Sequence, residues 1–160
     1  MKTHILQALK LNLFYAETNL LDLTDEQMTT IPDGLKNHPA WLVGHILGAY
    51  GFAFEAFEAP QALPDGWAEL FGMGSTARAN GYPTKDELLE ALRGAHAHLT
   101  ELIEDSSEAQ LDAPSDEDSP LHAMFPRVGD VVVGASLVHE AVHLGQLSAW
   151  RTVMGLPLAF

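Results

Sequence analysis

Two histidines near the end of the sequence have the spacing of a metal site. His139 and His143 are four residues apart, and on an α-helix of about 3.6 residues per turn their side chains project roughly 40° apart from one face. Two imidazoles placed in this way can bind the same divalent ion. The alternative is chance spacing of capping or solvated histidines, but the residues around the pair argue against it.

Glu140 completes the sequence His-Glu-Ala-Val-His, which is the H-E-x-x-H pattern of zinc peptidases. Three features argue against a peptidase. None of the 17 residues after His143 is His, Asp or Glu. Gln146 and Ala149 occupy the positions of the glycine and third histidine of the longer metzincin pattern, and no strand pattern is present to align a peptide. Glu140 can still reach the rim of a metal site as a catalytic base; a solvated acid is the alternative.

The third metal ligand is therefore expected upstream, and His45 is the best candidate. It interrupts an apolar helical stripe, where an unpaired imidazole is unfavourable. Taken alone, His45 is better explained as a core histidine with a backbone or hydroxyl partner; the pair on the last helix reverses that preference. Three neutral histidines leave a coordination position open for water or substrate, as in catalytic sites. Zinc and nickel are the first expectation, and iron, cobalt and manganese accept the same ligands.

Other polar residues are weaker candidates for the site. His96 and His98 project about 200° apart on one helix and cannot both face one ion. His38 precedes a proline and suits a helix cap. Gln146 follows His143 by one turn, which leaves open a hydrogen-bonding partner of the ligand or a satisfied core amide.

The composition limits the classes of function. The 160 residues are 47% hydrophobic and carry a formal net charge of −14, so we expect one domain over residues 1–160 and no nucleic-acid partner. No cysteine is present, which excludes disulfides and thiolate metal ligands within the chain. We expect no membrane association and a cytoplasmic location, because residues 39–54 are too short for a membrane span and the first residues lack a secretory pattern.

Apolar residues at helical spacing predict four long helices, over about residues 5–23, 39–57, 84–102 and 130–154. The valines at 131–133 leave a strand as the alternative for the last segment. The inward stripe predicted for the second helix comprises Trp41, His45, Gly48 and Phe52. Pro60 to Pro83 form a long crossover with a short helix at 67–71. Two roles are open for Trp67, Phe71 and Tyr82, which either line the pocket or close the core. Four amphipathic helices without strands predict an all-α four-helix bundle.

Three segments together resemble the DinB-like (damage-inducible) family of metal-binding bundles. They are His38-Pro39-Ala40-Trp41 followed by Gly44-His45-Ile46, Tyr82-Pro83-Thr84, and HEAVHLGQL followed by Arg151 and Met154-Gly155-Leu156-Pro157. The resemblance covers nearly the whole chain. It implies an up-down-down-up bundle with a long crossover loop, a divalent metal on three histidines, and frequent homodimers.

Characterised members of the resembled family include metal-dependent thiol S-transferases that use bacillithiol and a mycothiol-dependent maleylpyruvate isomerase. Others are described only as metal-dependent hydrolases. By this analogy we expect the metal to activate a low-molecular-weight thiol or a water against a small-molecule substrate, with S-transfer ahead of hydrolysis. The alternatives are a bundle that binds metal or a small ligand without catalysis, and a purely structural bundle.

Overall fold

The computed structural model describes residues 2–61 and 63–158, and its regular elements are helices. The long helical segments are α1 (Lys2–Leu20), α3 (Pro39–Ala56), α5 (Lys85–Asp105), and a last helix made of α7 (Val128–Val132), η1 (Val133–Val138) and α8 (His139–Val153). The short helices are α2 (Asp25–Met28), α4 (Trp67–Phe71) and α6 (Glu108–Asp112). Within the described ranges no β-strand forms, and no helix is both long and apolar enough to cross a membrane.

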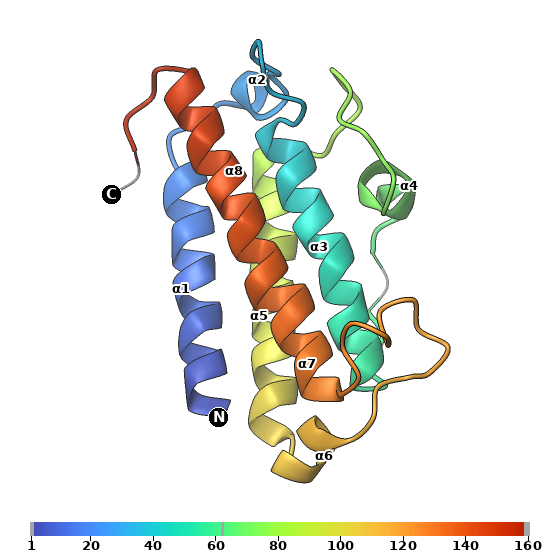
Figure 1. Ribbon diagram of the computed structural model, residues 1–160. Helices are drawn as coiled ribbons and strands as arrows, with labels where there is room; N and C mark the ends of the chain where they lie inside the picture. The colour runs from blue at the N-terminus through green and yellow to red at the C-terminus, as the bar shows by residue number, and fades with distance from the viewer. Residues whose placement is uncertain (1, 62, 159–160) are drawn as a thin grey trace.

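The four long segments lie side by side (Figure 1). The chain runs up through α1, down through α3 and again down through α5, and returns upward through α7, η1 and α8. Each of α1 and α3 packs against both α5 and α8. This arrangement confirms the predicted all-α bundle and its up-down-down-up order. Because α3 and α5 run in the same direction, the connection between them has to return along the bundle, which accounts for its length.

Local sequence signals set the beginnings of the helices. Thr24 with Gln27, and Thr84 with Glu87, form capping boxes at the starts of α2 and α5. At the start of α3, the Nδ1 atom of His38 accepts a hydrogen bond from the backbone N–H three residues later, at 3.1 Å. His38 is therefore a helix cap, as predicted, and lies outside the histidine cluster described below.

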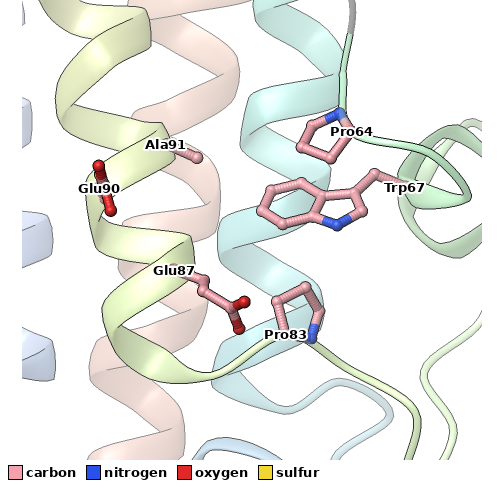
Figure 2. A pocket seen from close by; sticks show the side chains of 6 residues that line it. All are labelled: Pro64, Trp67, Pro83, Glu87, Glu90 and Ala91. Atoms are coloured by element: carbon pink, nitrogen blue, oxygen red, sulfur yellow. The ribbon is translucent and has the colours of Figure 1, made fainter.

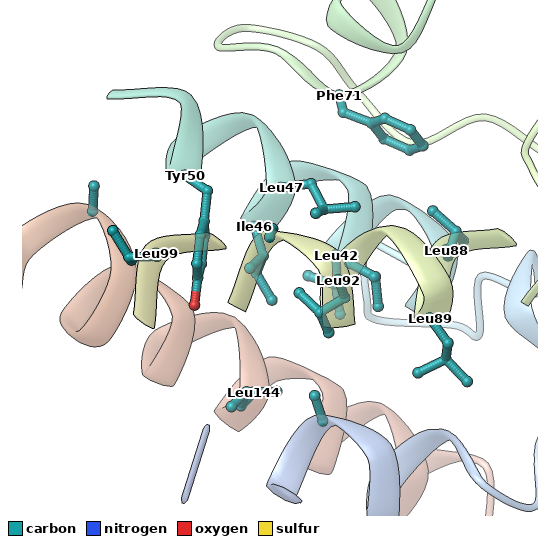
Figure 3. Close-up of a cluster of buried hydrophobic side chains, with 14 of the residues drawn as sticks. Leu42, Ile46, Leu47, Tyr50, Phe71, Leu88, Leu89, Leu92, Leu99 and Leu144 are labelled. Carbon is teal, nitrogen blue, oxygen red and sulfur yellow. The ribbon is translucent and has the colours of Figure 1, made fainter. Parts of the chain in front are cut away.

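The inward face of α3 differs from the prediction. Its most deeply buried residues include Leu42, Ile46, Tyr50 and Ala53, which lie one or two positions further along than the predicted stripe; the first three are visible in Figure 3. Gly48 and Phe52, two members of the predicted stripe, are only half-buried. The reason is that 11 of the 18 residues of α3 are buried, so the helix has no polar face from which the direction of the core can be read.

The last helix is continuous from Val128 to Val153, which rules out a strand at residues 131–133. Its middle segment, η1, is a π-helix that the sequence analysis did not predict. A π-turn contains one residue more than an α-turn and so rotates everything after it by about 100°. That rotation places Val131, before η1, and Leu144 and Leu147, after it, on the same buried side.

The crossover packs onto α3 at a glycine, Gly44. The short helix α4 has the predicted bounds, and its last residue, Phe71, is fully buried. A Cβ atom added to Gly44 would lie 2.3 Å from the Phe71 ring, so the ring occupies the space that any other residue at position 44 needs.

We predict that Gly44→Ala lowers the free energy of unfolding by about 1–3 kcal/mol, because the buried ring has no room to move. Gly48→Ala, one turn further along α3, is the control: its added Cβ would lie 3.8 Å from the Phe71 carbonyl oxygen, an ordinary contact. That change should stabilise α3 by about 0.5–1 kcal/mol. Urea denaturation of both variants tests the prediction, and equal effects would contradict it.

Candidate metal centre

The structure brings together the three histidines selected from the sequence. His45 projects from α3, and His139 and His143 project from the first two turns of α8. One ring nitrogen from each lies within 4.8 Å of the others. The Nε2 atoms of His139 and His143 are 3.1 Å apart, and the ring of His45 is centred 5.1 Å and 4.9 Å from theirs, respectively. Such a group could hold one metal ion.

Two of these rings are oriented by hydrogen bonds on the side away from the cluster. His45 donates from Nδ1 to the carbonyl oxygen of Phe71 at 2.7 Å, and His143 donates from Nδ1 to Oε1 of Gln146 at 3.1 Å. A carbonyl oxygen only accepts, so each Nδ1 carries the proton and each Nε2 keeps a lone pair. Metal-binding histidines typically have such partners. Gln146 therefore has the hydrogen-bonding role that its spacing suggested.

His139 is less completely satisfied. Its Nδ1 atom is buried and has no hydrogen-bond partner among the described residues, while its Nε2 faces the lone pair on His143. Burial, with smaller contributions from His143 and His45, lowers the pKa of His139 to about 4, so the ring is neutral and free of a second proton near neutral pH. A divalent cation fits these nitrogens, because metal–nitrogen bonds of about 2.0–2.1 Å place two ligands of one ion roughly 3 Å apart.

Trp41 covers one face of the cluster. Its ring stacks on His45, with centroids 4.5 Å apart and planes inclined by 14°. The indole N–H donates to Oγ of Ser75 at 3.1 Å, so the loop after α4 holds the tryptophan in place. The sequence analysis assigned Trp41 to the core and missed this contact, which depends on a residue 34 positions away.

The sequence profile of the DinB superfamily matches residues 16–147, a span that includes all three histidines. The chain belongs to the DinB superfamily. A solved structure of a conserved protein from Enterococcus faecalis has a similar fold, with a TM-score of 0.72 and 20% sequence identity over 97% of this chain and 98% of that chain. At this identity the likeness shows a shared fold alone. Among curated proteins, none matches this chain significantly.

Glu140 lies elsewhere in this DinB-superfamily protein than we expected. Its side chain has no exposed surface. Its Oε2 accepts hydrogen bonds from the Tyr50 hydroxyl at 3.0 Å and from the Asn12 amide at 3.2 Å, and its Oε1 accepts one from Nε2 of His96 at 2.9 Å. The carboxylate thus points into the interior of the bundle, which corrects both the rim position and the solvated alternative. We do not retain Glu140 as a catalytic base.

The partners of Glu140 are buried polar residues that the sequence analysis left without a role or treated as weak ligands. Tyr50 and His96 lie on the core faces of α3 and α5, and Asn12 is half-buried on α1. Burial, together with the nearby charge of Glu140, raises the pKa of Tyr50 well above its usual value. The sequence does show that Asn12, Tyr50 and His96 are polar residues in largely apolar helical segments. It does not show that all three side chains bind the same carboxylate.

The three crossover residues expected to line the pocket or close the core have different positions. Phe71 contributes its carbonyl oxygen to His45, as described above. Tyr82 packs its ring edge-on against His38, with centroids 4.5 Å apart. Trp67 lines a cavity of about 430 Å³ between the crossover and α5, which Figure 2 shows. None of the three histidines lines that cavity. The cavity beside Trp67 is therefore separate from the candidate site.

The lowered pKa of His139 predicts acid sensitivity in the metal-free protein. A histidine of an unfolded chain titrates near 6.5, whereas His139 in the folded protein titrates at about 4. Between these pH values the unfolded chain binds more protons, so the free energy of unfolding should fall as the pH falls through this window. Urea denaturation across the window should show a smaller slope in His139→Asn than in the wild type; equal slopes would contradict the assignment.

Proposed function

We propose that this protein is a metal-dependent enzyme in which His45, His139 and His143 hold one divalent ion. The supporting observation is the three-histidine cluster, with two Nε2 lone pairs oriented by hydrogen bonds on the opposite side of each ring. A bound divalent ion supplies Lewis acidity, which brings the pKa of a coordinated thiol or water toward neutrality. Zinc and nickel are the ions that we propose first, and iron, cobalt and manganese also suit nitrogen ligands.

The residues around the cluster favour an anionic nucleophile. Three neutral imidazoles do not compensate the charge of a divalent ion, so a negatively charged group is favoured in any remaining position. Trp41 excludes water from one face of His45, whereas His45 and His139 are only half-buried and remain accessible from solvent. The site therefore combines a fixed set of ligands with an approach for a small molecule.

We place thiol S-transfer ahead of hydrolysis. The support is the resemblance to DinB-like thiol transferases, together with the absence of cysteine from this chain, which means that any thiol would come from a small molecule. The homodimer implied by the same resemblance stays a prediction, which light scattering on the purified protein tests.

A metal-binding bundle without catalysis is the second candidate. The observation that favours it is that cavities of about 430, 240 and 590 Å³ are all lined by residues other than the three histidines. A screen of small thiols against electrophiles separates the two candidates. Metal-dependent consumption that is lost in His139→Ala supports the enzyme, and no consumption with any thiol class supports the binding protein.

The proposal predicts close to one metal ion per chain in protein purified without a polyhistidine tag. His45→Ala and His143→Ala should each lose most of this metal, because two remaining imidazoles bind an ion more weakly. His98→Ala is the control, since the His98 ring packs on Phe54 outside the cluster. Mass spectrometry of the metal content measures all four proteins. A wild type that stays metal-free after metal is supplied would overturn the proposal.

A further inference from the structure

One buried carboxylate joins all four long segments of the bundle. Glu140 is the second residue of α8, and its hydrogen-bond donors come from α1 (Asn12), α3 (Tyr50) and α5 (His96). The Tyr50 hydroxyl and the Nε2 atom of His96 also lie 2.9 Å apart, so the donors contact one another as well as the carboxylate. In Figure 3 the Tyr50 side chain extends from α3 toward α8.

The carboxylate lies directly after the π-helical segment. A π-helix is rare and usually extends over a single turn within an α-helix. Contacts from outside η1 hold this one in place. The Asn12 amide, which binds Glu140, also donates to the carbonyl oxygen of Leu137 at 3.3 Å. The Phe125 ring covers Gly134 so closely that an added Cβ would lie 2.4 Å from it.

The rotation of α8 decides whether the histidines face His45. The extra residue of η1 changes that rotation by about 100°, whereas His139 and His143 project within roughly 40° of each other. A change of one residue in the helical register would therefore turn both rings away from α3. Glu140 lies roughly 60° around the helix from His143 and points into the interior of the bundle, so fixing its carboxylate also fixes the direction of the neighbouring rings.

We propose that Glu140 is a positioning residue, which together with Tyr50 and His96 sets the rotation of α8 so that His139 and His143 face His45. This inference rests on the proposed function only in that metal binding is its readout. An apolar side chain would fill a plain core position at lower desolvation cost than a carboxylate. Three donors that converge on the first turn of the ligand-bearing helix instead define one direction for that helix.

Cobalt(II) titration of Glu140→Gln and Tyr50→Phe tests the proposal. Both changes preserve the shape of the side chain and remove part of the hydrogen bonding. We expect Glu140→Gln to weaken cobalt binding about 10–100-fold, the range for residues that orient metal ligands, and to change the visible absorption spectrum of bound cobalt. Tyr50→Phe should act in the same direction with a smaller effect, and it decides the question if Glu140→Gln does not fold.

Asp22→Asn is the matched control. Asp22 accepts two hydrogen bonds from Arg151 of α8, at 2.6 and 2.9 Å, so this change also weakens a contact between α8 and the chain that follows α1. Urea denaturation should show lower stability, while the cobalt affinity and spectrum stay those of the wild type.

Three outcomes are decisive. Weaker cobalt binding and an altered spectrum in the two network variants, with neither change in Asp22→Asn, support the positioning role. Lower stability with wild-type affinity and spectrum in the network variants overturns that role and leaves the proposed metal site intact. A wild type that binds neither cobalt nor zinc overturns the proposed function, and this inference with it.

Discussion

The hydrogen bonds to the Glu140 carboxylate constrain the whole bundle. A carboxylate without exposed surface is tolerated only where donors replace its water, and here each donor comes from a different helix. Leucine-rich cores accept small shifts of one helix against another, because apolar contacts have no direction. A hydrogen bond weakens steeply with distance and angle. The polar contacts of Asn12, Tyr50 and His96 therefore select one packing of helices among those that the apolar residues allow.

The candidate metal centre also depends on the topology. Since α3 and α5 are parallel, the chain has to cross the length of the bundle between them, and this crossover packs against α3 next to His45. It contributes the carbonyl oxygen of Phe71 and the hydroxyl of Ser75, which orient His45 and Trp41. The three histidines belong to the long helices, but the carbonyl oxygen that orients His45 belongs to the crossover.

The sequence was sufficient for features that depend on nearby residues. Capping boxes such as Thr84 with Glu87 mark helix starts within one turn, and the apolar spacing of α1 and α5 gives the directions of their cores. The pairing of His139 with His143 is equally local, and an imidazole in an apolar stripe identified His45. These signals, with the resemblance to the DinB family, were enough for the all-α fold, and they selected the three histidines that the structure brings together.

The features missed by the sequence analysis depend on contacts between distant segments. The side of α3 that faces the core cannot be read from its sequence, because the helix is apolar on most sides. That side is determined by the packing of α3 against α5 and α8. The extra residue in η1 was not predicted, because apolar residues of that segment such as Val133 and Leu137 suit either helix type. Glu140 looked like a rim residue because its three donors lie on other helices, between 44 and 128 positions away in the chain.

The contact between Gly44 and Phe71 also affects how such a site can diverge during evolution. All three histidines are carried by helices whose packing the core determines. The carbonyl that orients His45 belongs to Phe71, whose ring is buried against Gly44, whereas most of the crossover residues that the structure describes are exposed or half-buried. Substitutions at the exposed crossover positions can shift Phe71 and alter the tilt of one imidazole, while the long helices and all three histidines stay the same. The geometry of the candidate site can therefore diverge in evolution without a change in the residues that form it.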